Sequence, residues 1–211
     1  MILARHKLRC SEIQFLVGAP RVFRMSRELS LTMGGRTTSA ANRAHNVITR
    51  RSLLAAGVFG FGFSGLIDVL VLHHILQWHH LVSGLYPMNT LNGLQTNILA
   101  DGLFSVGMLI IMGVGAGLLW QSERRTDVPL AMRPLAGAAI IGLGVFDVYD
   151  SVVDHALLGL HQPVGPGGQP LSFGGQYNPH WLVVSLLFIA AGYYVYRTGL
   201  QERARGAEEL D

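Results

Sequence analysis

The sequence predicts an all-α fold, an integral membrane four-helix bundle with a 2+2 internal repeat. Half of its 211 residues are hydrophobic and only 14% are charged, whereas about a quarter of a typical soluble domain is charged. Four long apolar segments follow the first 50 residues, and two of them contain the same spacing of Asp and His. These features together indicate a membrane protein built from two related helix pairs.

Each apolar segment is predicted to be one membrane-spanning helix, because a span takes roughly 20 residues. The four predicted spans are 53–78, 98–120, 135–160 and 181–196. The first three reach the required length, whereas the fourth is short and is expected to extend into its flanks. The transmembrane domain is therefore assigned to residues 51–198, and a cytoplasmic tail to residues 199–211.

Residues 1–50 form a basic leader without a hydrophobic period, which we expect to be disordered. Residues 1–51 contain ten Arg or Lys and two Glu. A basic segment can indicate nucleic-acid binding, but no nucleic-acid motif accompanies it, so no nucleic-acid partner is expected. The single cysteine, Cys10, excludes an intrachain disulfide and a Cys-based zinc or iron–sulfur site.

The arginines near the predicted helix ends indicate how the chain is oriented. They precede the first span, join the second to the third, and follow the fourth: Arg50, Arg51, Arg124, Arg125, Arg133, Arg197, Arg203 and Arg205. The other two loops, 81–97 and 161–180, contain neither Lys nor Arg. Because positive residues accumulate on the cytoplasmic side, we expect both termini in the cytoplasm and these two loops outside a bacterial inner membrane.

Small residues four positions apart predict close contacts between helices in a lipid bilayer. Gly113 and Gly117 form such a pair in the second span, and Ala138 and Gly142 form one in the third. We expect these pairs to lie at helix interfaces and to serve packing rather than chemistry.

A repeated polar pattern lies inside the first and third spans. It reads Asp, four residues, His, five residues, His, and each residue of the second copy follows its counterpart by 82 positions: Asp68, His73 and His79, then Asp150, His155 and His161. An Asp at the centre of a membrane helix costs about 2.5–3.5 kcal/mol. The several Asp residues of these spans must therefore face one another, His residues, water or a cation.

Imidazoles and carboxylates collect toward the outward end of the predicted bundle, where we expect a metal site. The candidate ligands are Asp68, His73, His79, His80, Asp101, Asp150, Asp154, His155, His161 and His180. In an α-helix, a residue five positions along points about 140° away. His73 and His155 are thus expected to diverge from Asp68 and Asp150, so that some candidates support the site without joining it.

Imidazole and carboxylate ligands without cysteine suit a transition metal ion such as iron, zinc, manganese or Cu(II). Haem held by His73 and His155 is the second interpretation, and it would make the protein a membrane electron carrier. Haem ranks lower because it does not account for the buried Asp residues. A third interpretation is a small proton or ion conductor that uses Asp68 and Asp150 as its relay.

The sequence does not decide whether the protein is an enzyme. Ser64, Ser105 and Ser151 lie near Asp or His in the sequence, but such spacing alone does not make a catalytic triad. The glycine clusters match neither a phosphate-binding loop nor a dinucleotide-binding fingerprint.

Three strings carry a resemblance to a known family: Ile75–His80 (Ile-Leu-Gln-Trp-His-His), Asp101–Phe104 (Asp-Gly-Leu-Phe) and Asp154–His161. They resemble a bacterial family of integral membrane proteins catalogued as domain of unknown function 2243, over about residues 53–197. Ser105 stands where that family's pattern has His, so this chain lacks one ligand position of the pattern. The resemblance implies a membrane protein without an assigned activity. It also implies metal handling for respiration, with a respiratory-chain or metal-delivery partner.

Overall fold

The computed structural model describes residues 47–164 and 177–208, which all belong to one compact unit, Ala40–Asp211. The elements are α2 (Arg50–Asp68), the π-helical segment η1 (Val69–Ile75), α3 (Leu91–Glu123), α4 (Met132–Tyr149), the π-helical segment η2 (Asp150–Leu157) and α5 (Asn178–Glu208). Residues 1–46 of the predicted leader and most of the loop over 161–180 lie outside the described residues.

The described residues contain four helices long and apolar enough to cross a membrane: Arg50–Ile75, Leu91–Glu123, Met132–Leu157 and Asn178–Glu208. The all-α prediction and the four predicted spans are therefore confirmed, although the boundaries differ. The second helix begins at Leu91 rather than at residue 98, because the Thr90 side chain accepts a hydrogen bond from the Gly93 N–H and caps a polar first turn. The fourth helix extends into both flanks, as expected.

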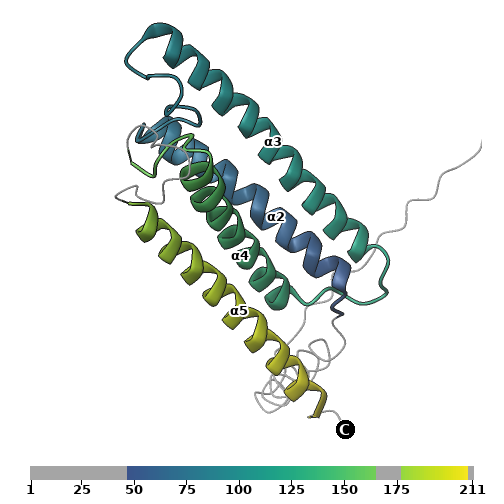
Figure 1. Ribbon diagram of the computed structural model, residues 1–211. Coiled ribbons are helices and arrows are strands. Elements are labelled where there is room, and N and C mark those ends of the chain that lie inside the picture. The colour runs from purple at the N-terminus through teal and green to yellow at the C-terminus, as the bar shows by residue number, and fades with distance from the viewer. Residues whose placement is uncertain (1–46, 165–176, 209–211) are drawn as a thin grey trace, which may run out of the picture. The chain divides into compact units, whose positions relative to one another are not determined.

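The four helices lie in a row in the order α3, α2, α4, α5 (Figure 1). The two middle helices, α2 and α4, pack against each other and continue into η1 and η2. Within the described residues, α3 packs on α2 and η1, and α5 packs on α4 and η2. The two segments that carry the repeated polar pattern are thus neighbours at the centre of the row.

Small residues make the contacts between these helices close. A side chain at Gly142 would overlap with the carbonyl oxygen of Gly57, so α2 and α4 touch backbone to backbone there. The prediction for the second span is wrong, because a side chain at Gly113 or Gly117 would meet no atom within 4 Å. Gly115, which lies between them, is the glycine that packs α3 against the backbone of α2.

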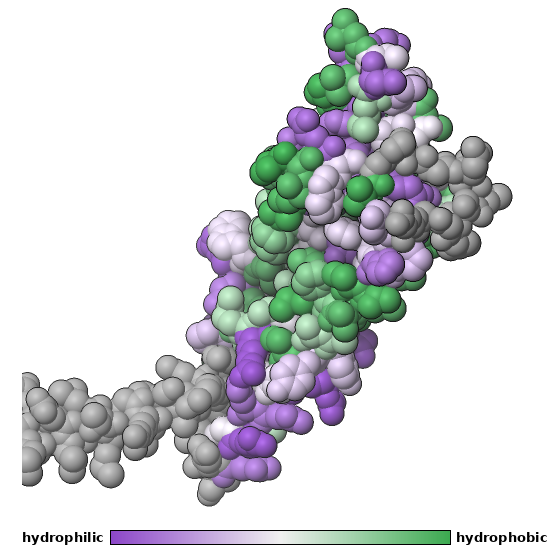
Figure 2. All heavy atoms as spheres, turned by 90° about the vertical axis from the view of Figure 1, so that its left-hand side faces the viewer, coloured by the Kyte–Doolittle hydropathy of each residue, from purple (hydrophilic) through white to green (hydrophobic). Residues whose placement is uncertain are grey.

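The surface of the helices suits a lipid environment. Large apolar side chains such as Leu103, Ile110 and Leu187 are more than half exposed along α3 and α5. Figure 2 shows hydrophobic residues over the middle of the helices and hydrophilic residues gathered at the lower end, where α2 and α4 begin. At that end the Arg133 guanidinium pairs with the Glu202 carboxylate. The repeated polar pattern lies at the opposite end of the row.

Candidate metal centre

Both middle helices change from α-helical to π-helical hydrogen bonding at the Asp of the repeat. The change follows Asp68 in the first copy and begins at Asp150 in the second. Because π-helical bonds join residues five apart, residue i+5 lies about one turn above residue i. His73 Nε2 is accordingly 3.4 Å from Asp68 Oδ2, and His155 Nε2 is 3.1 Å from Asp150 Oδ2. The predicted divergence of each His from its Asp is therefore wrong, because it assumed an α-helical period.

The chain then reverses sharply after each π-helical segment. Gln77 and Gly159, which are 82 positions apart, have positive φ angles of 50° and 64°. The same pair of backbone hydrogen bonds closes both turns, again with an offset of 82 residues. These reversals direct His79 and His161 back toward the helix ends. Both side chains are buried, with 1% of their surface exposed, whereas a continued helix would have placed them at the membrane surface.

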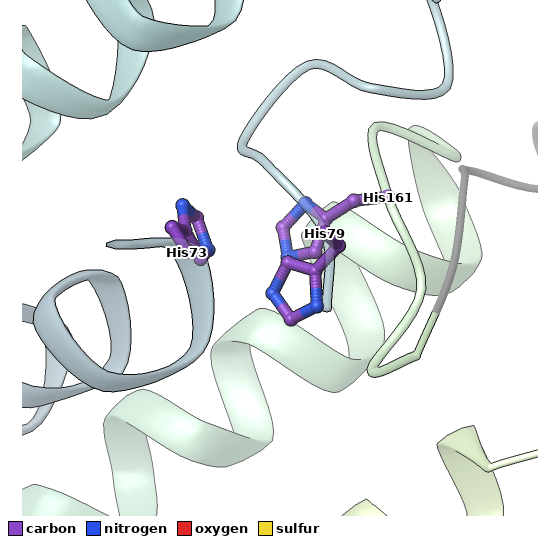
Figure 3. A group of neighbouring side chains, drawn as sticks. All are labelled: His73, His79 and His161. Carbon is purple, nitrogen blue, oxygen red and sulfur yellow. The ribbon is translucent and has the colours of Figure 1, made fainter. Parts of the chain in front are cut away.

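Four imidazoles meet between the two reversals, those of His73, His79, His155 and His161. The ring centroid of His79 lies 4.6 Å from the ring centroid of His73 and 4.6 Å from that of His161. The ring centroids of His155 and His161 are 4.5 Å apart. Figure 3 shows His73, His79 and His161, which come from η1 and from the two loops. We call this cluster, together with Asp68 and Asp150, the His–Asp centre.

The Nδ1 atom of each of these four imidazoles donates to an oxygen atom. The pairs are His73 with Asp101 Oδ1 at 2.8 Å, His79 with Pro163 O at 3.0 Å, His155 with Asn178 Oδ1 at 2.8 Å, and His161 with Leu81 O at 3.1 Å. Carbonyl and carboxylate oxygens accept hydrogen bonds, so Nδ1 carries a proton in each ring, and in a neutral ring the lone pair is then on Nε2. Metal-bound histidines in proteins are oriented in this way.

All four Nε2 atoms are buried and form no hydrogen bond within the described residues. Those of His73, His155 and His161 lie 3.1–3.4 Å from a carboxylate oxygen of Asp68 or Asp150. Burial lowers the pKa of His79, and it lowers the pKa of His161 to about 4. The two imidazoles are therefore neutral at pH 7, which is the state in which a ring nitrogen can bind a metal ion.

The carboxylates stand at distances that suit shared coordination. Two neighbouring ligands of one ion, each about 2.1 Å from it, lie roughly 3.0–3.4 Å apart. The contacts of Asp150 with His155 Nε2 (3.1 Å) and His161 Nε2 (3.4 Å) fall in this range. Two triads offer ligand atoms within 4.8 Å of one another: His73, His79 and His161, and Asp150, His155 and His161. His161 belongs to both triads.

The remaining predicted ligands lie around this centre or away from it. His80 Nδ1 donates to Asp101 Oδ2 at 2.6 Å, so this pair supports the His73 ring. Asp154 is buried in η2 and belongs to neither triad. His180 is exposed and lies beside the ring of Tyr177, with 6.4 Å between centroids. The Ser105 hydroxyl donates to the Asp101 carbonyl of its own helix.

The sequence reasoning missed three groups that orient the centre. Asn178 accepts the His155 hydrogen bond and donates to the Ser151 carbonyl, which fixes its amide. The other two are the carbonyl oxygens of Leu81 and Pro163. Backbone oxygens have no signature in the sequence. Asn178 stands at the start of the fourth helix, but a lone Asn there reads as an ordinary helix-start residue.

Four membrane-length helices in one row, with imidazoles and carboxylates buried at one end, define a multi-pass membrane protein with a polar site inside its helices. The chain belongs to the family described as "Predicted membrane protein (DUF2243)", whose model matches residues 55–199. This match confirms the family resemblance seen in the sequence. Neither the curated proteins nor the solved structures contain a match to the chain.

Proposed function

We propose that the His–Asp centre binds a transition metal ion. The observation that carries this proposal is the convergence of four buried Nε2 atoms, each on a ring held in place by a hydrogen bond at Nδ1. A buried polar atom without a partner costs about 1–3 kcal/mol. A single cation would supply partners to several such atoms at once, and the carboxylates of Asp68 and Asp150 would balance its charge.

The donor set narrows the choice of ion. Imidazole nitrogen and carboxylate oxygen suit iron, zinc, manganese or Cu(II), and the absence of thiolates in the centre disfavours Cu(I). If the outward orientation predicted from the arginines holds, the centre faces the side of the membrane opposite the cytoplasm. There it would serve metal handling for respiration or a membrane redox reaction.

The geometry favours an ion over haem. A haem held by His73 and His155 would need its flat macrocycle between these two imidazoles. The rings of His79 and His161 occupy that space: His79 lies 4.6 Å from His73, and His161 lies 4.5 Å from His155.

The geometry also weighs against a channel for protons or ions. The polar residues continue inward from the centre as far as Asp147, whose Oδ1 accepts a 2.8 Å hydrogen bond from Ser64. Residues 53–63 of α2 and residues 134–146 of α4 then contain no ionisable or hydroxyl group. About 11 residues of helix correspond to roughly 16 Å, which is half of a bilayer core without a relay.

The test is elemental analysis and a visible spectrum of the protein purified in mild detergent. We expect stoichiometric metal in the wild type and its loss in His161→Ala, because His161 belongs to both triads. His180→Ala is the matched control and should retain the metal, since His180 is exposed and outside the cluster. A wild type that takes up no metal on reconstitution, or an unchanged metal content in His161→Ala, would overturn the proposal. A Soret band would establish haem instead.

A further inference from the structure

A cavity of about 190 Å³ lies between α2, α4 and α5, next to the His–Asp centre. Its walls are mostly apolar, and Phe63, Ile67 and Phe188 at its rim are 40–42% exposed. These rim residues lie within membrane-length helices. The cavity is therefore accessible from the lipid side of the protein.

The inner wall of this cavity is polar, unlike the rest of its lining. Asp68 and Asp147 line it with 8% and 6% of their surfaces exposed. Trp181 also lines it, and its Nε1 is buried without a hydrogen-bond partner within the described residues. Because Asp68 Oδ2 lies 3.4 Å from His73 Nε2, the cavity and the His–Asp centre share this carboxylate as a common wall.

We infer that this cavity binds the head group of a quinone or quinol that enters from the lipid. A quinone carbonyl would accept the unpaired hydrogen bond of Trp181, and a quinol hydroxyl would donate to Asp68 or Asp147. The cavity volume of about 190 Å³ suits a single six-membered ring, since an engineered apolar cavity of about 150 Å³ accommodates benzene. The inference rests on the proposed function in one respect, because it places the quinone ring beside the proposed metal centre, with the Asp68 carboxylate between them.

The polar wall argues for this occupant over a lipid. An acyl chain would leave the buried Trp181 N–H without a partner and would cover two carboxylates with hydrocarbon, and burying polar groups in this way is costly. A phospholipid head group remains at the membrane surface, whereas Asp68 and Asp147 lie inside membrane-length helices. Ionisable residues at such depth mark binding sites and pathways.

The test uses a photoreactive azidoquinone with the full-length protein in lipid nanodiscs. Irradiation should label α5 between Trp181 and Phe188, as mapped by peptide mass spectrometry. Ile67→Phe narrows the rim and should reduce this labelling by about tenfold. Val145→Phe is the matched control. Val145 is similarly exposed, at 45%, but lines a separate pocket formed by α2, α3 and α4, so labelling should not change.

Unlabelled short-chain quinone should compete with the probe, and an equal concentration of fatty acid should not. Equal competition by fatty acid, or equal labelling in Ile67→Phe and the wild type, would overturn the inference. Metal content is measured on the same samples, which separates the two proposals. If the protein contains metal but the cavity is not labelled, only the quinone inference fails. If the cavity is labelled but the protein contains no metal, only the proposed metal centre fails.

Discussion

In each of the four imidazoles of the His–Asp centre, Nδ1 makes a hydrogen bond and Nε2 makes none, and the contacts of Asp101 explain this difference for His73. Its Oδ1 accepts from His73 Nδ1 at 2.8 Å and from the Leu81 N–H at 2.9 Å, and its Oδ2 accepts from His80 Nδ1 at 2.6 Å. One buried carboxylate from α3 thus fixes the His73 ring and the turn that follows η1. We therefore propose that Asp101 is a positioning residue, because it contacts the imidazoles of His73 and His80 and belongs to neither triad.

We expect Asp101→Asn to weaken metal binding by about 10–100-fold, which is the usual effect of removing a partner that orients a ligand. The new amide nitrogen cannot accept a hydrogen bond, so either His73 or His80 loses its acceptor. Competition with a metal buffer would measure the affinity.

Asp127→Asn provides the control for this prediction, because Asp127 is exposed in the loop between α3 and α4. The same change of charge there should leave the affinity unchanged. If Asp101→Asn bound metal as tightly as the wild type, the positioning role would be refuted.

Among the secondary-structure elements, the two central helices share an arrangement that supports a duplication. Each changes to π-helical hydrogen bonding at the repeat Asp, and each reverses direction at a residue with positive φ. Each also receives one orienting acceptor from its flanking helix, Asp101 from α3 and Asn178 from α5. The 2+2 repeat stays a prediction, and these correspondences are the structural reason to keep it.

The close contact between α2 and α4 makes Gly142 a sensitive position. Gly142→Leu should lower the free energy of unfolding by at least about 1–3 kcal/mol, because its side chain would overlap with the Gly57 carbonyl oxygen. Thermal unfolding in detergent would measure this loss. Gly113→Leu adds the same side chain where no atom lies within 4 Å, and it should unfold at nearly the wild-type temperature. Equal losses in both variants would contradict the packing explanation.

In the molecule as a whole, the arginines and the His–Asp centre lie at opposite ends of the helix row. The loop between α3 and α4 lies at the arginine end, and the loops that contain His79 and His161 lie at the other. The positive-inside rule therefore predicts that the centre opens on the non-cytoplasmic side.

Labelling of single cysteines in intact bacterial cells tests this orientation. In a Cys10→Ser background, Val164→Cys should react with a membrane-impermeant maleimide, since Val164 is 43% exposed at the end with the centre. Asp127→Cys should react only after the membrane is permeabilised. The reverse pattern would show that the centre faces the cytoplasm.

The sequence by itself determined the four helices and marked the Asp and His residues of the repeat as the polar groups inside them. Hydrophobic length sets a membrane span because an unpaired backbone group in lipid is costly. The cost of a charge in lipid likewise requires Asp68 and Asp150 to point inward. Both effects are local, so they can be read from a single chain. The identity of the metal ligands and the role of the site stay predictions.

Only the tertiary structure decided how these groups meet. The π-helical register places His73 above Asp68, and hydropathy does not distinguish that register from an α-helical one. The reversals at Gln77 and Gly159 return two further histidines to the helix ends, and Asn178 reaches His155 from another helix. These features depend on hydrogen bonds to backbone and to distant residues, which leave no periodic signal in the sequence. Packing between helices likewise depends on residues far apart in the sequence, and Gly115 rather than Gly113 or Gly117 lies at the helix contact.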